Sequence, residues 1–396
     1  MKNKNIMQFL SALVFLFAFS ITTFAQQKVV TLEKAGTLSE QFTEEELNTI
    51  TDLKVIGEIN GADIYFIRSI TGLLYAKNIT SFDLSEAKIV ASNIAYYRIF
   101  EHENDPKYFT KDNEIGEKMF ESRVKIKSIM LPKNITQIGN KAFMGCSNLE
   151  TIKLSDNLKV IETMGFYGCD KIDNIIFPKS VKKIDDNAFS SCYNLKNITF
   201  LNSVAEFGTN VFSRCGMDKI ILPSDMTEVP KRCFPNCSNF KQLEFPQAIK
   251  TIKWEAFWGC SNLETVFIPK SLEFIEIGAF TLCDNIKAVY NYNPIPTPLE
   301  SISYAGDSPF DRSTHEKATL FVPRGSLEAY KNASGWKRFF NIQEFDAPAS
   351  IAQTNAEEIE AKPIAYYSLD GKQRKEPVKG VNIVKMSDGS VKKIIF

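Results

Sequence analysis

The residue types best suited to chemistry in this sequence are its eight cysteines and two histidines. Thiols can form disulfides, bind metal ions or act as nucleophiles, and a histidine can activate a thiol as its base. Seven of the cysteines recur every 23 residues, with one interval of 22: Cys146, Cys169, Cys192, Cys215, Cys237, Cys260 and Cys283. This regular spacing indicates that the thiols occupy equivalent positions in successive structural repeats.

The cysteines belong to a longer repeated phrase, I-G-x-x-A-F-x-x-C-x-x-L, as in NITQIGNKAFMGCSNLETIKLS (134–155). Its phenylalanine recurs in step with the cysteine, at Phe143, Phe166, Phe189, Phe212, Phe234, Phe257 and Phe280. One more copy, IGEKMFESRVKI (115–126), has Arg123 in the cysteine column. A repeat of this length predicts a solenoid, in which each coil buries its apolar side against its neighbours.

Each coil contains a short predicted strand, as in LETIKL (149–154), where Leu149, Ile152 and Leu154 face inward. Pro ends this strand in five of seven coils, because it lacks the N–H needed for pairing. A return segment adds two apolar positions, such as Ile135 and Ile138. The predicted fold is therefore a repeat solenoid of 23-residue coils, with strands of successive coils stacked in parallel about 4.8 Å apart.

This stacking decides between the possible roles of the thiols. Cysteines on adjacent coils would point the same way with Cβ atoms about 4.8 Å apart, beyond the 3.5–4.5 Å that a disulfide prefers. Cys233 takes the alanine position of its coil, so CFPNC is not a metal pair, and no cluster of four ligands is evident. A Cys–His nucleophile would need an exposed thiol, whereas these thiols should lie in a buried column. The only two histidines, His102 and His315, lie about 210 residues apart in the sequence. We predict buried, unbridged thiols, no cofactor, no metal and no enzyme; a carboxylate pair for sugar cleavage stays open.

These repeats resemble the BspA-like leucine-rich repeat family of bacterial surface proteins over residues 115–290. The flanks are similar too: INGADIYFIR and ITSFDLSEAKIV resemble that family's N-terminal cap, and ATLFVPRGSLEAYKNASGWKRF its C-terminal cap. The resemblance implies a right-handed horseshoe or arc with a parallel sheet on the concave face. It also implies adhesion to host matrix proteins or to other cells.

The N-terminus has the features of a secretory signal. Lys2 and Lys4 precede the apolar core FLSALVFLFAF (9–19), and Thr23-Phe24-Ala25 forms a small-residue cleavage site. No cysteine follows that site to carry a lipid, and no later segment approaches 18 continuous apolar residues. We expect a secreted or cell-surface protein that is neither a lipoprotein nor membrane-spanning. With 47 basic and 47 acidic residues, nucleic acid is an unlikely partner.

The predicted organisation runs as follows: a signal peptide (1–25), an α/β N-terminal cap with an insertion (26–114), the repeats (115–290), a C-terminal cap (291–345), a linker (346–363) and a β tail (364–396). Ser39 and Ser326 are predicted helix caps, and Trp336 and Phe339 should close the last coil. The tail has three predicted strands around two Asp-Gly turns and resembles C-terminal sorting or attachment segments; a β appendage on the C-terminal cap is the alternative.

Two sets of exposed residues are candidates for binding. The first is the lane that should point out of the sheet, where apolar and aromatic side chains are frequent: Met130, Lys153, Ile176, Ile221, Phe267 and Tyr290. The strand preference of such residues is the plainer explanation. The second is the aromatic insertion NIAYYRIFEHENDPKYF (93–109), with Tyr96, Tyr97 and Tyr108. These rings could anchor a protein or a glycan, or fold back to cover the end of the stack.

The sequence therefore predicts a monomeric, exported, non-catalytic protein-binding or adhesion module at the cell surface, whose macromolecular ligand is a host or cell-surface protein. One alternative is a structural envelope scaffold without a dedicated ligand. Another is a glycan-binding protein that uses the aromatic insertion. Nothing in the residues selects a matrix protein, a glycan or another bacterial protein as the ligand.

Overall fold

The computed structural model describes residues 26–72, 77–98, 106–202, 204–299 and 308–346, together with residues 363–367, 373–374, 376, 381–386 and 391–395 of the tail. The predicted signal peptide and nearly all of the predicted linker lie outside these ranges. The chain divides into two compact units. Unit 1 comprises residues 1–217 and 230–238, and unit 2 comprises residues 218–229 and 239–396.

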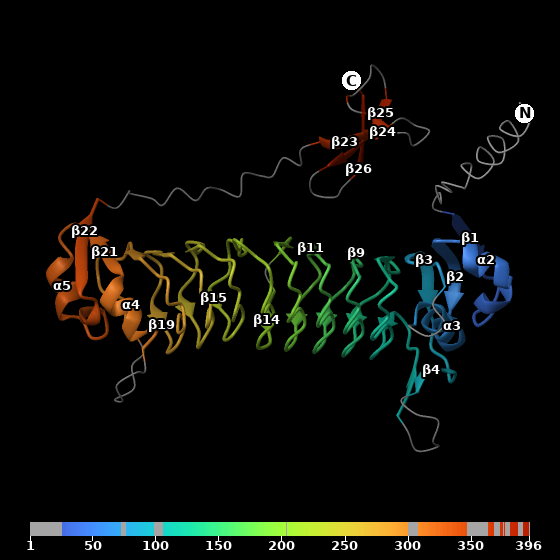
Figure 1. Cartoon of the computed structure of the whole chain (residues 1–396), viewed down its shortest axis with the longest axis horizontal. Helices are drawn as coiled ribbons and strands as arrows, with labels where there is room; N and C mark the ends of the chain where they lie inside the picture. The colour runs from blue at the N-terminus through green and yellow to red at the C-terminus, as the bar shows by residue number, and fades with distance from the viewer. Residues whose placement is uncertain are drawn as a thin grey trace, which may run out of the picture. The chain divides into compact units, whose positions relative to one another are not determined.

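Unit 1 has two main sheets whose strands are all parallel, and successive coils add one strand to each (Figure 1). The first has the order β1-β2-β3-β7-β9, from β1 (Gln27–Thr31), β2 (Asp52–Ile59), β3 (Ser81–Ile89), β7 (Ser128–Met130) and β9 (Thr151–Lys153). The second has the order β14-β12-β10-β8-β6, from β6 (Glu114–Ile115), β8 (Gln137–Ile138), β10 (Val160–Ile161), β12 (Lys183–Ile184) and β14 (Glu206–Phe207). Strands β11 (Asn174–Phe177) and β13 (Asn197–Phe200) form a separate parallel pair.

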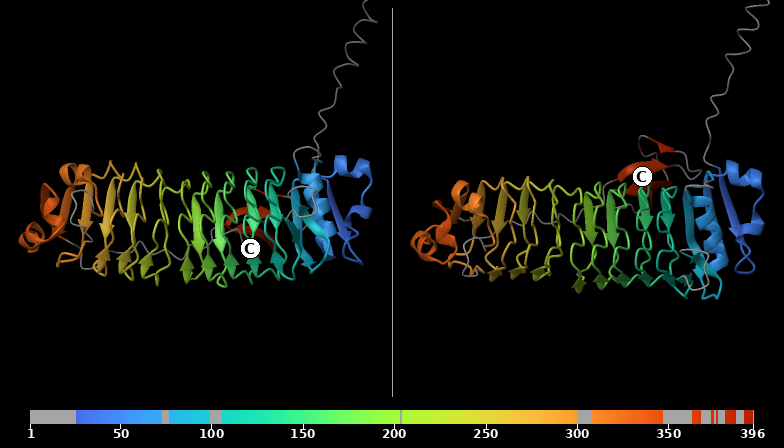
Figure 2. Two further views of the ribbon diagram at one scale, coloured as in Figure 1. Left: turned by 90° about the horizontal axis from the view of Figure 1, so that it is seen from below. Right: turned by 60° about the horizontal axis from the view of Figure 1, so that its bottom comes forward.

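The register of these strands equals the sequence repeat. Ile129 pairs with Ile152, Ile138 with Ile161, and Ile161 with Ile184, each one repeat apart. Equivalent residues therefore form columns, which confirms the predicted repeat solenoid. In Figure 2 the same strands lie side by side within unit 1.

The phenylalanine column forms the centre of unit 1. Phe120, Phe143, Phe166, Phe189, Phe212 and Phe234 are buried and stack consecutively, with ring centroids 5.0–5.7 Å apart. The Phe143 and Phe166 planes differ by only 2°. Each such pair adds about 0.5–1.5 kcal/mol beyond the free energy of burial. One continuous pile of rings within the unit is what the sequence repeat predicts.

The cysteine column has a structural role that explains the choice of residue. All eight cysteines are buried and unbridged, which confirms the predicted thiols. Six thiols donate to the carbonyl of a column phenylalanine in the preceding coil at 3.0–3.2 Å, namely Cys146, Cys169, Cys192, Cys215, Cys237 and Cys283. Most of these carbonyls already accept a backbone N–H, as that of Phe143 does from Cys146 at 3.1 Å, so the thiol is a second, weak donor to the same oxygen, which alanine could not supply.

The thiols should consequently be unreactive in the folded protein. Burial raises the pKa of Cys192 to about 12, so the nucleophilic thiolate is scarce near neutral pH. We expect Ellman's reagent at pH 8 to modify almost no thiol in native protein and all eight cysteines after unfolding in guanidinium chloride. Rapid modification of several thiols in the native protein, or fewer than eight after non-reducing unfolding, would contradict the buried column.

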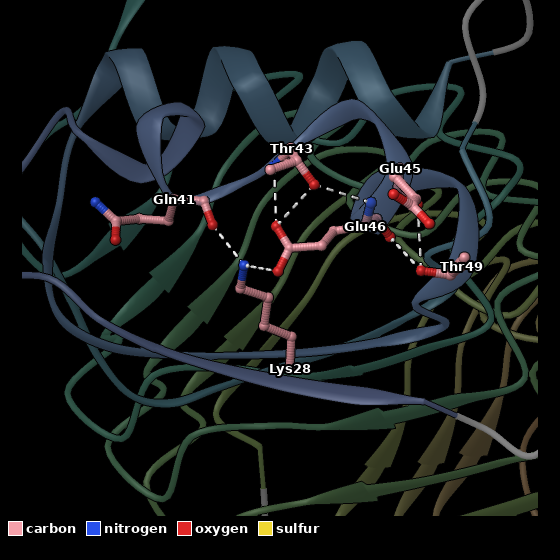
Figure 3. Close-up of polar contacts among 6 residues, drawn as sticks. All are labelled: Lys28, Gln41, Thr43, Glu45, Glu46 and Thr49. Atoms are coloured by element: carbon pink, nitrogen blue, oxygen red, sulfur yellow. Dashed lines mark hydrogen bonds and ion pairs between the residues drawn. The ribbon is translucent and has the colours of Figure 1, made fainter.

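The N-terminal cap contains two α-helices, α2 (Glu44–Thr49) and α3 (Gly61–Thr71), and a short 3-10 helix, η1 (Leu38–Gln41). The predicted cap at Ser39 is wrong, because α2 begins after Thr43. Thr43 and Glu46 form a reciprocal capping box, and Lys28 of β1 pairs with Glu46 at 2.7 Å (Figure 3). The Thr-x-x-Glu signature starts four residues after Ser39 and satisfies the first free N–H groups of the helix.

The repeats and the C-terminal cap in unit 2 are also built from parallel sheets. One has the order β15-β17-β19, from β15 (Glu228–Val229), β17 (Thr251–Ile252) and β19 (Phe274–Ile275). The other has the order β16-β18-β20-β21-β22, from β16 (Gln242–Glu244), β18 (Thr265–Ile268), β20 (Ala288–Asn291), β21 (Thr319–Pro323) and β22 (Asn341–Phe345). The last two strands belong to the C-terminal cap, so this cap continues the repeat sheet.

The rest of that cap closes the ring column of unit 2. Phe280 stacks on Phe257 at 5.6 Å and on Phe310 at 5.0 Å. Trp336 and Phe339 are buried beyond Phe310, as predicted. The helices are α4 (Arg312–Lys317), α5 (Leu327–Asn332) and the 3-10 helix η2 (Trp336–Arg338).

The predicted cap of α5 is correct in position but not in chemistry. Ser326 is the N-cap residue of α5, yet its hydroxyl donates to the carbonyl of Pro294. The carboxylate of Glu344 instead accepts from the backbone N–H of Gly325 at 2.7 Å and of Leu327 at 3.3 Å. Strand β22 therefore supplies the negative charge at the start of this helix.

The described part of the tail forms four antiparallel strands where three were predicted, in the order β24-β23-β25-β26. They are β23 (Pro363–Tyr367), β24 (Gln373–Arg374), β25 (Val381–Met386) and β26 (Val391–Ile395). The additional strand, β24, has only two residues. Both Asp-Gly pairs lie outside the described residues, between strands that pair in antiparallel fashion.

Candidate binding surface

One outward row of side chains in unit 2 combines residues from the repeats and from the C-terminal cap. The strand register aligns Glu244, Phe267, Tyr290, Phe321 and Gln343 across β16, β18, β20, β21 and β22. The preceding row points inward: Leu243, Val266, Val289 and Leu320 are fully buried, and Ile342 at the end of the row is partly exposed. Since side chains alternate along a strand, the first row faces away from the core. We call Phe267, Tyr290 and Phe321 the aromatic ridge.

The three rings of the aromatic ridge stack face to face. The centroids of Phe267 and Tyr290 lie 5.2 Å apart, and those of Tyr290 and Phe321 lie 4.5 Å apart, with interplanar angles of 15° and 9°. All three side chains are half-buried. Because the rings stack along the direction in which the strands stack, their planes stand upright on the sheet. The parts that reach solvent are therefore ring edges.

A second aromatic pair supports the ridge at the ends of β20 and β22. The ring centroid of Phe345 lies 5.6 Å from that of Tyr290 and 5.3 Å from that of Tyr292, and in both pairs the ring planes are nearly perpendicular. Burial, reinforced by the negative charge of Glu244, raises the pKa of Tyr292. The phenol of Tyr292 is thus neutral near physiological pH. The carboxylate of Glu244 lies close enough for its negative charge to disfavour ionisation of this phenol.

The residues around the ridge are mostly polar but uncharged. The neighbouring outward row contains Gln242, Thr265, Ala288, Thr319 and Asn341. Its members are linked to each other and to the ridge row by side-chain hydrogen bonds, such as Asn341 to Thr319 at 2.7 Å and Gln343 to Asn341 at 3.1 Å. Within these two described rows, Glu244 is the single charged side chain.

Of the six residues predicted for the exposed face, only Phe267 and Tyr290 belong to the aromatic ridge. Met130 and Lys153 pair across β7 and β9 of unit 1 and are exposed, the former by 36%. Ile176 is 38% exposed on β11, also in unit 1. Ile221 belongs to unit 2 and is 48% exposed, but it lies on no strand, so it is not part of the row.

Phe321 is the residue of the ridge that sequence reasoning missed. It follows Tyr290 by 31 residues, so the 23-residue repeat does not align the two. The alternation in TLFVP (319–323), with Leu320 and Val322 buried, is the signal that could have placed Phe321 on the outward face.

The insertion forms an antiparallel hairpin of β4 (Ala95–Arg98) and β5 (Lys107–Phe109). Tyr96 is only 1% exposed and its hydroxyl donates to the carbonyl of Glu117 at 2.6 Å. This corrects its place among the candidate binding residues, because a buried, hydrogen-bonded ring cannot reach a ligand. Phe100 and His102 of the insertion lie outside the described residues.

Tyr97 and Tyr108 are engaged by the protein itself. Their rings stack at 5.6 Å. The guanidinium of Arg68 lies 4.0 Å from the centroid of Tyr97, and Lys118 lies 5.1 Å from that of Tyr108. Burial lowers the pKa of Arg68 to about 10, and its guanidinium donates to two carbonyls, those of Lys118 and Met119. The described part of the hairpin thus covers the N-terminal cap, in agreement with the alternative in which it folds back.

The described residues contain no group of three or more His, Cys, Asp or Glu that could hold a metal ion. His315 is 5% exposed, and burial, aided by the positive charge of Arg338, lowers its pKa to about 4. Among the same described residues, no helix is both long and apolar enough to cross a membrane.

The match to a family model agrees with this architecture. The family model of the BspA type leucine rich repeat region matches residues 113–241 and 206–320, with six copies. Similar solved structures include a leucine-rich repeat protein from Bacteroides ovatus, with 19% identity, 80% of this chain and 69% of that chain covered, and a TM-score of 0.43. Another is a leucine rich cell surface protein from Faecalibacterium prausnitzii, with 18% identity and a TM-score of 0.27; the match covers 67% of this chain and 83% of that chain. The pneumococcal vaccine antigen PcpA has 15% identity and a TM-score of 0.26; the match covers 68% of this chain and 89% of that chain. No protein with a curated description matches the chain.

Proposed function

The chain belongs to the BspA-type leucine-rich repeat family, and from this premise we propose that it is a non-catalytic cell-surface protein that binds a macromolecule through the aromatic ridge. Proteins of this family are typically found at the cell surface, and the N-terminal segment has the features of a secretory signal. The antiparallel β tail would serve as the attachment segment.

The observation that carries this proposal is the half-exposed stack of Phe267, Tyr290 and Phe321 on the outward face of a sheet. Contiguous apolar surface rimmed by polar residues is typical of interaction sites. Aromatic side chains also dominate the binding energy of protein interfaces, since they bury a large area at a small entropic cost. The uncharged rows beside the ridge would form the polar rim of such an interface.

The arrangement of the rings disfavours the alternative of a glycan-binding protein. Sugars bind aromatic residues by stacking on ring faces. Both faces of Tyr290 are occupied by Phe267 and Phe321. In the insertion, Tyr97 is covered by Tyr108 and Arg68, and Tyr108 by Tyr97 and Lys118. The alternative of a structural envelope scaffold differs from the proposed function because it predicts no partner whose binding depends on the aromatic ridge.

The double change Phe267→Ser and Tyr290→Ser is expected to abolish partner capture while the repeats stay folded. The side chains point outward, so their loss removes contact area for a ligand but leaves the buried ring column intact. The immobilised protein should be tested against extracellular-matrix proteins and whole neighbouring cells. We expect binding to weaken by at least about tenfold.

Ile221→Ser is the matched control, because Ile221 is exposed in the same unit but lies outside the ridge. It should bind as the unaltered protein does. Retention of binding by the double variant would refute the ridge as the binding surface. Absence of any partner for the unaltered protein would favour the scaffold alternative.

A further inference from the structure

We infer that the occupant of the aromatic ridge is an extended polypeptide segment that carries apolar side chains and a basic residue. This inference rests on the proposed function and names the class of partner. It follows from the orientation of the rings, from the charge of the outward rows and from the length of the row.

The orientation of the rings favours a polypeptide over a sugar. Phe267, Tyr290 and Phe321 present their edges to solvent, because each contacts its neighbour through a ring face. Ring edges carry partial positive charge and ring faces partial negative charge. The groups that complement an edge are peptide carbonyl oxygens and the faces of other aromatic rings. A polypeptide supplies both, together with aliphatic side chains that cover the hydrocarbon of the edges.

The charge of the two outward rows favours a basic partner. Glu244 is exposed, lies next to Phe267 in the row and accepts a 3.3 Å hydrogen bond from Gln242. Where these strands begin, Glu264 pairs with Lys287 at 2.9 Å and is also under the positive charge of Lys241, so these three groups form a separate cluster just before the two outward rows. A lysine or arginine of the partner would complement Glu244, whereas an acidic segment would meet an unbalanced carboxylate.

The length of the row sets the size of the segment. From Glu244 on β16 to Gln343 on β22 there are four strand spacings of about 4.8 Å, or about 19 Å. An extended chain covers this distance with about six residues. The basic side chain should lie at one end of the segment, over Glu244, and the apolar side chains should follow it over the three rings.

A random dodecapeptide library displayed on phage tests the inference directly. Selection on the full-length protein should enrich peptides that combine Lys or Arg with apolar residues. Selection on Glu244→Lys should enrich Asp and Glu in place of Lys and Arg. Peptides selected on the unaltered protein should bind Glu244→Lys about tenfold more weakly and should lose binding to the Phe267→Ser, Tyr290→Ser variant.

Glu328→Lys is the matched charge control, because Glu328 is exposed on α5 of the same unit and pairs only with Lys331 three residues away among its described contacts. It should leave the selected composition unchanged. Ridge-dependent peptides without a charge preference would overturn the inference, as would binding of neutral oligosaccharides on a glycan array in place of peptides. The proposed function would survive either result if the double serine variant still lost its natural partner.

Discussion

Phe189→Ala is expected to lower the free energy of unfolding by about 3–5 kcal/mol, the range for a large buried aromatic replaced by alanine. Phe189 is fully buried, stacks on Phe166 at 5.0 Å and on Phe212 at 5.7 Å, and meets Phe177 edge to face at 5.4 Å. The missing side chain would leave a cavity that is lined by all three neighbouring rings. Since neighbouring coils stabilise one another, the loss should spread along the unit.

Urea unfolding followed by far-UV circular dichroism measures this effect as a fall in the midpoint. Tyr193→Ala is the matched control, because Tyr193 lies four residues further on but is 54% exposed. It should change stability by no more than about 0.5 kcal/mol. A loss below about 1 kcal/mol for Phe189→Ala would mean that the column is not the centre of the core.

The repeat made the interior predictable because each coil places the same residue in the same surroundings. Once Phe143, Phe166 and Phe189 recur at one spacing, parallel stacking requires that their rings meet, and the thiols follow from the same columns. No such argument applies where the repeat ends. Thr43 replaces Ser39 as a helix cap because a single local pair, Thr43 with Glu46, decides the start of the helix.

The candidate site was predicted only in part for the same reason. Phe267 and Tyr290 lie in repeats and could be assigned to one lane, whereas Phe321 lies in the cap at a different spacing. Tyr96 illustrates a second limit, since an aromatic residue on a long insertion is equally compatible with a ligand site and with burial. Its hydrogen bond to Glu117 depends on tertiary structure that no sequence period specifies.

Acidification should destabilise the C-terminal cap through His315. The ring centroid of its imidazole lies 4.9 Å from that of Phe339 and 6.4 Å from that of Phe310, and its buried Nε2 has no hydrogen-bond partner among the described residues. The folded protein therefore holds this histidine neutral, with a pKa of about 4 instead of 6.5. The positive charge of Arg338 on η2 also disfavours protonation of His315 and so lowers its pKa. Asp311 is the N-cap residue of α4, the helix that carries His315.

The sign of the effect follows from this lowered pKa. Above pH 6.5 the imidazole is neutral in both states, and the full stability is present. Between pH 6.5 and about 4 the unfolded chain binds a proton that the folded chain does not, so stability falls as the pH falls. A shift of this size corresponds to a loss of about 3 kcal/mol by pH 4. Below that pH both states are protonated and this contribution stays constant.

His315→Phe should remove this pH dependence, because phenylalanine fills a similar space among the rings and does not titrate. Urea midpoints of the two proteins, measured from pH 7.5 to 4 with the fluorescence of the buried Trp336 as one probe of the cap, should diverge as the pH falls. The carboxylates titrate in both proteins, so the difference between the two curves isolates the histidine. Parallel curves for His315→Phe and the unaltered protein would mean that the imidazole finds a proton acceptor or water in the cap, and that His315 is not held neutral by burial.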